Sequence, residues 1–267
     1  MSDIKIGKAR YVALWSLSED FSEEREQLLK PLLDIYSTIH VKADERVKEY
    51  SEAIKQAKKD AEIEGSWDPE EYSSIEALES FIDDIAFKFQ LHRTAIAQSI
   101  LITAQTYLHS KFQAAFAAYK SYHKSTKVHE LRKRIFDLGP SIGFVTWAAG
   151  VKAASNYVRH YEEWHVETEI WKKRDDGQIS ITQRNDLFDQ FKLLKKDKPG
   201  EIETVWTLIQ MGFSEREVFD SRHNIAYKLV AKLKLNLNDE FSRNSGMWIA
   251  EIVKTLENDL PEEVRSV

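Results

Sequence analysis

The chain of 267 residues contains no cysteine, and only nine glycines and five prolines interrupt it. The lack of cysteine excludes a disulfide framework, a thiol nucleophile and a thiolate zinc site, and it is compatible with a reducing compartment. No run of about 18 uncharged apolar residues is present, so no membrane span is expected. The opening stretch, MSDIKIGKARYVALW, lacks the apolar core of a secretory signal, which favours a cytoplasmic protein.

The chain also lacks an excess of positive charge, since its formal net charge is −6. A protein that coats nucleic acid without regard to sequence needs a positive field to displace counterions, so that class is disfavoured, although a local basic patch is still allowed. Charged residues of both signs make up 31% of the chain and apolar residues 42%. With so few helix breakers, this composition is typical of long, exposed helices around a sizeable core and predicts an all-α fold.

Two long helices are predicted in the first half of the chain, where apolar residues recur at intervals of three and four. After a strand-like segment over 4–15, the first helix is expected to bend near Pro31 and to become mostly charged in its second half. The second helix is expected to begin at a capping box formed by Ser73 and Glu76 and to continue for about fifty residues without Gly or Pro. Its stretch over 95–118 is apolar enough to be buried on most sides.

The second half of the chain is predicted to form shorter helices and one small β-hairpin. A basic helix over 127–136 ends at the sequence DLGPSIG, and a mostly apolar helix follows up to Trp164. Asp176-Gly177 lies between two short alternating runs, which is a hairpin signal. The remaining helices are expected at 186–196, 201–211, 215–235 and 240–258.

These elements define four predicted segments: a strand-like segment with a long helix (1–72), a helical core (73–166), a β-hairpin arm (167–182) and a C-terminal helical subdomain (183–267). A second capping box, formed by Ser214 and Glu217, lies in the last segment.

Most enzyme signatures are missing as well. The chain has no Gly-rich phosphate loop, no pair of metal-binding histidines at helical spacing and no nucleophile-elbow serine, so we predict neither a metal nor a cofactor. One stretch, AASNYVRHYEEWH, is rich in functional groups. On a helix, Asn156 lies one turn before His160, and Arg159 one turn before Glu163. His165 is about 240° around the helix from Arg159, so the two meet only if the helix ends or distorts there, or a second subunit contributes.

Arg159-His160-Tyr-Glu-Glu-Trp-His165 resembles the motif of the HEPN superfamily of helical ribonucleases and nucleotide-binding proteins, in which an Arg and a polar residue are followed by a short spacer and a His. The setting is similar too, because the stretch ends a helix that follows a long apolar helix. The resemblance covers residues 74–165 and implies a HEPN-like helical bundle. It also implies a homodimer, at whose interface the motif residues cleave RNA without metal.

By this resemblance, Arg159 would contact phosphate, His165 would act as general acid or base, and His160 would be the orienting polar residue. Asn156, one turn upstream, is placed to hydrogen-bond His160. A His can move a proton to or from the ribose 2′-hydroxyl near neutral pH, and an Arg stabilises the charge that develops on the phosphate. The resemblance further implies a toxin or antiphage-defence role, with a neutralising or activating protein partner.

A structural interpretation fits the same stretch. In it, Tyr157, Tyr161 and Trp164 pack into the body of the protein, while Arg159 and Glu163 form an exposed ion pair that contributes little to stability. Binding without cleavage is a third interpretation.

A basic cluster just upstream supports RNA binding, because such a patch attracts phosphates and its aromatic neighbours can stack on bases. The candidate RNA-binding residues are Lys124, Lys127, Arg132, Lys133 and Arg134. The alternative is a solvated, charged helix. Among the histidines, His129 looks like a surface residue, whereas His92 and His109 in the apolar helix are expected to be buried and hydrogen-bonded.

Two other stretches have weaker signals. Arg222-His223-Asn224-Ile-Ala-Tyr227 resembles a second form of the HEPN motif without its terminal His, which favours a structural or binding role. LIQMGFSEREVF resembles the opening of a ubiquitin-associated domain, but Gly212 as a helix C-cap explains it without a partner.

We therefore predict a metal-independent endoribonuclease. The alternative is a non-enzymatic helical scaffold or regulatory module that binds proteins through the exposed part of the first helix and the β-arm.

Overall fold

The computed structural model describes residues 27, 29–64, 69–120, 127–164, 166–167, 169–173, 177–219 and 224–259. Within these ranges the chain is mostly helical with two small antiparallel sheets, which confirms the predicted helical character. The strand-like segment over 4–15, Lys124, His165 and the Arg222-His223 pair lie outside them. None of the described helices is long and apolar enough to cross a membrane.

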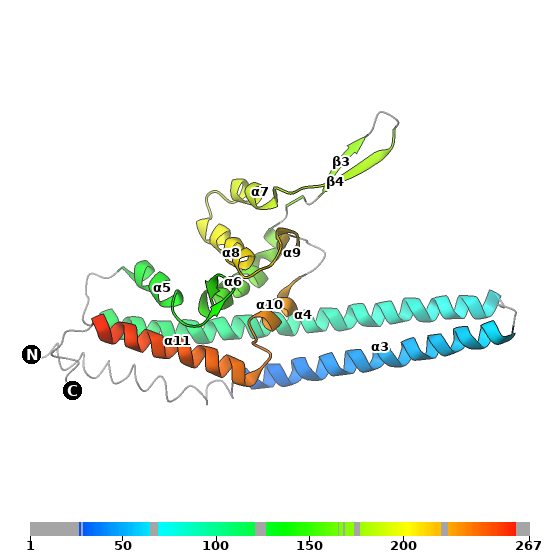
Figure 1. The fold of residues 1–267 in the computed structure, drawn as a ribbon, viewed down its shortest axis with the longest axis horizontal. Helices are drawn as coiled ribbons and strands as arrows, with labels where there is room; N and C mark the ends of the chain where they lie inside the picture. The colour runs from blue at the N-terminus through cyan, green and yellow to red at the C-terminus, as the bar shows by residue number, and fades with distance from the viewer. Residues whose placement is uncertain are drawn as a thin grey trace, which may run out of the picture.

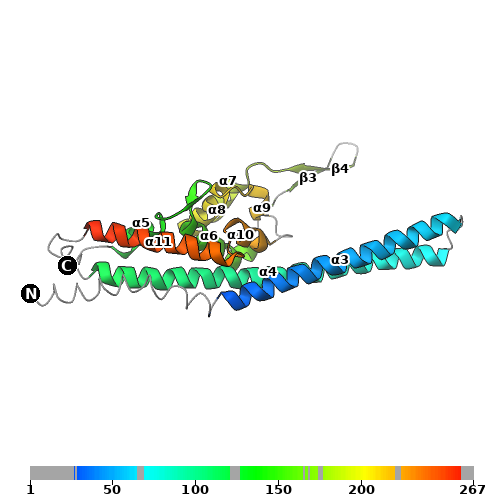
Figure 2. The ribbon, with the colours of Figure 1, turned by 60° about the horizontal axis from the view of Figure 1, so that its bottom comes forward.

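Helices α3 (Lys30–Glu64) and α4 (Pro69–Lys120) form a long antiparallel hairpin that projects from one end of the molecule (Figures 1 and 2). Pro31 lies in the first turn of α3, where its missing N–H costs no hydrogen bond. Helix α4 starts at Pro69, so the start predicted at Ser73 is wrong. A proline in the first helical position already has the required φ angle, and the helix therefore begins a turn earlier.

The two helices of the hairpin meet through apolar and charged contacts. The Tyr50 ring packs edge-on against Phe81, with ring centroids 5.8 Å apart. Near the far end, the Lys58 Nζ lies 2.8 Å from the Glu79 Oε1. His92, expected to be buried, is exposed, because the hairpin has only two helices and covers one side of α4 there.

The second half of α4 runs through the body of the protein. Its core side includes Ala97, Ile100, Leu101, Ala104 and Leu108, all fully buried. The body helices α5 (Val128–Phe136), α6 (Trp147–His160), α10 (Ala226–Lys232) and α11 (Asn238–Asp259) contact this half, and α8 (Pro199–Gln210) packs on α6 on the side away from α4 (Figure 1). Their buried residues form one apolar cluster with those of α4, so the C-terminal helices share the core of the central ones.

Two buried tryptophans join the ends of this core. The Trp147 indole donates a hydrogen bond to the Leu233 carbonyl at 3.0 Å, and the Trp248 indole donates to the Ile135 carbonyl at 2.9 Å. Both carbonyls lie near helix ends, where an acceptor has no partner inside its own helix. The bulky rings therefore fill the core without leaving their N–H groups unpaired.

The two sheets are β-hairpins. Strands β3 (Glu169–Lys173) and β4 (Ile179–Gln183) form the predicted arm, which projects away from the body (Figure 1). The shorter hairpin of β1 (Ser141–Ile142) and β2 (Val145–Thr146) was not expected from the sequence. Gly143 forms its turn with a φ of 62° and lies against the backbone of Gln210.

The helix predicted over 215–235 is instead two helices, α9 (Glu215–Phe219) and α10. The Asn224 side chain accepts a hydrogen bond from the Ala226 amide at 2.8 Å and so starts α10 anew. The predicted capping box before α9 is confirmed, since the Ser214 amide donates to the Glu217 carboxylate and the Glu217 amide donates to the Ser214 hydroxyl. Helix α7 (Leu187–Leu194) matches the helix expected over 186–196.

Candidate functional site

Helix α6 carries the polar stretch that the sequence singles out. The α-helix ends at His160 and tightens into the 3-10 turn η1 (Tyr161–Glu163). The helical geometry therefore changes directly after Arg159. This change is one of the conditions under which His165 can approach Arg159, although His165 itself lies outside the described part of the chain.

The aromatic residues of the stretch pack inward, as the structural interpretation expects. Tyr157 and Trp164 are buried, and their rings lie edge to face with centroids 5.8 Å apart. Tyr161 is half-buried against the same core. The Trp164 indole donates a hydrogen bond to the Glu201 carboxylate of α8 at 2.8 Å, which fixes the chain just before His165.

Glu201 connects the end of the motif to the α7–α8 turn. Its side chain is only 14% exposed and forms ion pairs with Lys195 at 3.0 Å and Lys198 at 2.9 Å. Burial raises the pKa of this carboxyl, but the hydrogen bonds from Lys198, Lys195 and Trp164 outweigh burial and leave the pKa below its usual value. Glu201 is therefore a charged, fully engaged anchor, which gives it a structural role.

Asn156 points toward α8. Its side-chain amide donates to the Thr204 hydroxyl over 3.4 Å, so its hydrogen bond does not go to His160 as the sequence suggests. Asn156 and His160 are both partly buried, but Asn156 bonds Thr204 of α8 while His160 pairs with Glu163 of the following turn.

His160 forms a pair within its own turn. Its Nδ1 lies 3.2 Å from the Glu163 Oε1, and the other oxygen of Glu163 lies 3.9 Å from the Lys198 Nζ. Glu163 therefore orients the His160 ring, a role that a carboxylate commonly has beside a proton-transferring His.

Arg159 is exposed and forms no ion pair with any residue that the structure describes. The structural interpretation predicts an Arg159–Glu163 pair, but Glu163 turns to His160 and Lys198 instead. A guanidinium without a carboxylate partner stays available to a phosphate.

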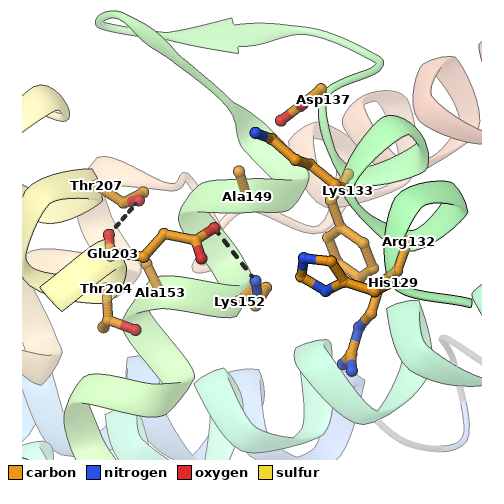
Figure 3. Close-up of a pocket in the computed structure, with 11 residues that line it drawn as sticks. His129, Arg132, Lys133, Asp137, Ala149, Lys152, Ala153, Glu203, Thr204 and Thr207 are labelled. Carbon is orange, nitrogen blue, oxygen red and sulfur yellow. Dashed lines mark hydrogen bonds and ion pairs between the residues drawn. The ribbon is translucent and has the colours of Figure 1, made fainter. Parts of the chain in front are cut away.

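A concave pocket lies between α5, α6 and α8, with a volume of about 150 Å³. We call it the basic pocket. The α5 side contributes His129, Arg132 and Lys133; the His129 and Lys133 side chains extend toward α6, whereas the Arg132 side chain runs toward α4 (Figure 3). The other lining residues are Phe136, Asp137, Ala149, Lys152, Ala153, Glu203, Thr204 and Thr207.

Arg132 is held by two aromatic rings. Its guanidinium lies over the rings of Phe112 and Phe136, 5.7 and 5.9 Å from their centroids, in cation–π contacts. Among the described residues, no carboxylate pairs with Arg132 or Lys133. Lys133 is exposed, so its ammonium is accessible to an anionic ligand.

Lys152 links the basic pocket to the motif. Its Nζ lies 3.6 Å from the Glu203 Oε1 across the pocket (Figure 3). Lys152 and Arg159 are seven residues apart on α6, and they therefore share one side of the helix about 10 Å apart along its axis. Asn156 lies between them and bonds Thr204, a residue of the pocket wall. The pocket and Arg159 thus belong to one continuous surface of α6.

The predicted basic cluster separates into two groups. Arg132 and Lys133 line the basic pocket. Lys127 instead pairs with Glu130 at 3.5 Å, and Arg134 pairs with Asp259. The sequence missed Lys152, Glu203 and Thr207, and it treated His129 as an ordinary surface residue. Nothing in their local sequence marks these four residues, because the pocket forms only when α8 packs against α6.

The two weaker motifs have structural explanations in the described residues. The Asn224 side chain accepts a hydrogen bond from the Ala226 amide at the start of α10, and Tyr227 lies under the Arg93 guanidinium, which is 4.2 Å from its ring centroid. Gly212 has a φ of 97° and ends α8, with the Phe213 amide bonded to the Leu208 carbonyl. This is the glycine C-cap that the sequence predicts.

In the described part of the chain, no three His, Asp or Glu side chains are grouped so as to hold a metal ion. Comparisons of the chain with models of protein families, with curated proteins and with solved structures gave no match.

Proposed function

We propose that the protein is a metal-independent endoribonuclease that holds RNA phosphates with the basic pocket and with Arg159. One observation carries the proposal: Arg132 and Lys133 line the basic pocket, Arg159 lies on the same side of α6 as the pocket residue Lys152, and none of the three cations pairs with a carboxylate of the described chain. Phosphates are the natural partners of such unpaired cations.

The cleavage step rests on the resemblance to HEPN ribonucleases. A histidine takes the proton of a ribose 2′-hydroxyl, whose oxygen attacks the neighbouring phosphorus. The 5′-oxygen of the next nucleotide leaves with a proton from a second group, which gives a 2′,3′-cyclic phosphate and a 5′-hydroxyl end. His165 is the proposed general acid or base, His160, held by Glu163, is the orienting polar residue, and Arg159 stabilises the charge on the phosphate.

The resemblance also supports a homodimer and a toxin or antiphage-defence role, controlled by a neutralising or activating protein. In the homodimer, Arg159 of one protomer and His165 of the other would complete each site.

A second candidate function is a non-enzymatic interaction module. The observation that favours it is the projecting α3–α4 hairpin, on which Phe87 and Leu91 are more than half exposed. Asn156 and Trp164 are also used in packing against α8. In this alternative, the hairpin binds a protein partner and the motif serves only the fold.

The test is an RNA-cleavage assay in EDTA with labelled single-stranded RNA. We expect the wild type to produce 2′,3′-cyclic phosphate ends, and Arg159→Ala and His165→Ala each to lower the rate at least about 100-fold. Arg46→Ala is the matched control, because Arg46 is an exposed arginine of the hairpin far from α6. Intact RNA with the wild type, or equal cleavage by either α6-region variant, would contradict the proposal and favour the interaction module.

A further inference from the structure

The two sides of the basic pocket offer different chemistry to a ligand. The α5 side presents the Lys133 ammonium together with the His129 ring. The α8 side presents Glu203, Thr204 and Thr207. A ligand that fits both sides must therefore accept hydrogen bonds at one end and donate them at the other.

The two hydroxyl groups of the α8 side already donate hydrogen bonds within their own helix. Thr204 donates to the Gly200 carbonyl and Thr207 to the Glu203 carbonyl, each at 2.8 Å within the helix. Each hydroxyl has one proton, so both now offer only lone pairs to a ligand. The Thr204 hydroxyl already accepts a hydrogen bond from Asn156, so Thr207 is the more available acceptor for a ligand.

Glu203 is the strongest acceptor of this side. Its carboxylate is held at the pocket by the ion pair with Lys152, in which Oε1 lies 3.6 Å from the Lys152 Nζ. That contact leaves the second carboxylate oxygen free for a donor from the ligand. An ionised carboxylate accepts hydrogen bonds only, and bonds to it are stronger than those to a neutral oxygen.

The size of the pocket limits the ligand to a small fragment. A cavity of about 150 Å³ holds a molecule the size of benzene, or about six heavy atoms. A phosphate group, with five heavy atoms, fits this volume, and the hydroxyl-bearing edge of its sugar would extend to Glu203 at the exposed side of the pocket. A ribose provides the donor in its 2′-hydroxyl, and a deoxyribose has no group at that position.

We infer that the basic pocket is a ribonucleotide subsite in which Lys133 holds a phosphate and Glu203 accepts the adjacent ribose 2′-hydroxyl. This inference rests on the proposed binding of RNA phosphates and adds a function: Glu203 selects RNA over DNA. The 2′-hydroxyl is the group by which proteins distinguish the two polymers. Glu203 is a specificity residue here and takes no part in bond cleavage.

The experiment compares three single-stranded oligonucleotides of one sequence: RNA, DNA and 2′-O-methyl RNA. The methylated RNA keeps the ribose but lacks the 2′ donor. Binding is measured by fluorescence anisotropy at several salt concentrations in the His165→Ala background, and the RNA is checked by gel for integrity. The readout is the ratio of the affinity for RNA to the affinity for DNA or 2′-O-methyl RNA. A ratio is used because loss of a carboxylate strengthens the binding of every polyanion.

We expect the parent protein to bind RNA about tenfold more tightly than DNA or 2′-O-methyl RNA, as a hydrogen bond to a charged acceptor allows. Glu203→Ala should reduce this ratio to about twofold or less. Lys133→Ala should weaken the binding of all three oligonucleotides equally. It should also lower the slope of log affinity against log salt concentration by about one. Lys254→Ala, which removes an exposed lysine of α11, should change nothing.

Each outcome separates the subsite from the nuclease. An unchanged ratio in Glu203→Ala, or equal binding of RNA and 2′-O-methyl RNA by the parent, would overturn the subsite even if the wild type cleaves RNA. A ratio that depends on Glu203 in a protein that never cleaves would keep the subsite and remove the nuclease. Failure to bind any of the three ligands would overturn both.

Discussion

The two halves of α4 lie in different surroundings. In the body, α4 contacts helices on several sides and Leu108 is fully buried, whereas in the hairpin it has α3 alone and Leu91 is 53% exposed. Most of the free energy of folding therefore comes from the body, and the hairpin is stabilised only by the interface between α3 and α4. The basic pocket is built by α5, α6 and α8 in the body, whereas the exposed apolar residues of α4, Phe81, Phe87 and Leu91, lie in the hairpin half.

The largest expected effect compares one substitution at two places in this helix. Leu108→Ala should lower the free energy of unfolding by about 3 kcal/mol, because it leaves a cavity in a closely packed core. Leu91→Ala should change it by less than about 0.5 kcal/mol, because its side chain is mostly in water already. Urea denaturation followed by circular dichroism measures both. Similar losses for the two variants would show that the hairpin is packed more tightly than described.

An intermediate effect is expected at two glycines with positive φ. Gly143→Ala should cost about 2 kcal/mol, because its Cβ would lie 2.6 Å from the Gln210 carbonyl oxygen and its φ of 62° disfavours a side chain. Gly177→Ala, in the β-arm, should cost about 1 kcal/mol or less, since no atom lies within 4 Å and only the backbone is strained. Thermal denaturation distinguishes them, and a larger loss for Gly177→Ala would contradict the assignment of the β1–β2 turn to the packed body.

The smallest effect concerns two carboxylates. Glu201→Gln should destabilise the protein by about 1 kcal/mol at pH 7, because two lysines lose their charged partner. The folded pKa of Glu201 is below that of the unfolded chain, so its contribution is present above about pH 4.5 and is lost as the pH falls through the folded pKa.

The wild type and Glu201→Gln should therefore become equally stable in acid, which urea titrations at several pH values can measure. Glu79→Gln, which breaks the exposed pair with Lys58 in the hairpin, should cost less than about 0.3 kcal/mol. A cost for Glu201→Gln that stays constant from pH 7 to pH 3 would mean that the charge of Glu201 is not what stabilises the α6–α8 contact.

Local patterns predicted the helices but not their termini in every case. The periodicity of the apolar residues gave α3 and α4, and the Ser214–Glu217 box gave the start of α9, because these signals act within one or two helical turns. The start of α4 at Pro69 and the break before α10 were missed. In both places a single residue at the helix start, Pro69 or Asn224, sets where the helix begins, and the longer apolar pattern does not reveal it.

The site was predicted in part for the same reason. Arg132 and Lys133 stand out because they belong to a basic run, and Arg159 because it belongs to a motif. Glu203 is more than fifty residues beyond Lys152, and only the packing of α8 on α6 brings the two within 3.6 Å. Separation in sequence hides such pairs, since helical periodicity shows which side of a helix is apolar but not which helix covers it.

The continuity of α4 has a mechanical consequence. Its 52 residues contain no glycine, and the only proline is the first residue, so the helix has no built-in joint over a length of about 78 Å. If α4 rotates as a rigid rod by one degree about its end in the body, its far tip therefore moves by about 1 Å. Distance measurements between a label at the hairpin tip and a fixed point would thus amplify small movements of the body into readable ones.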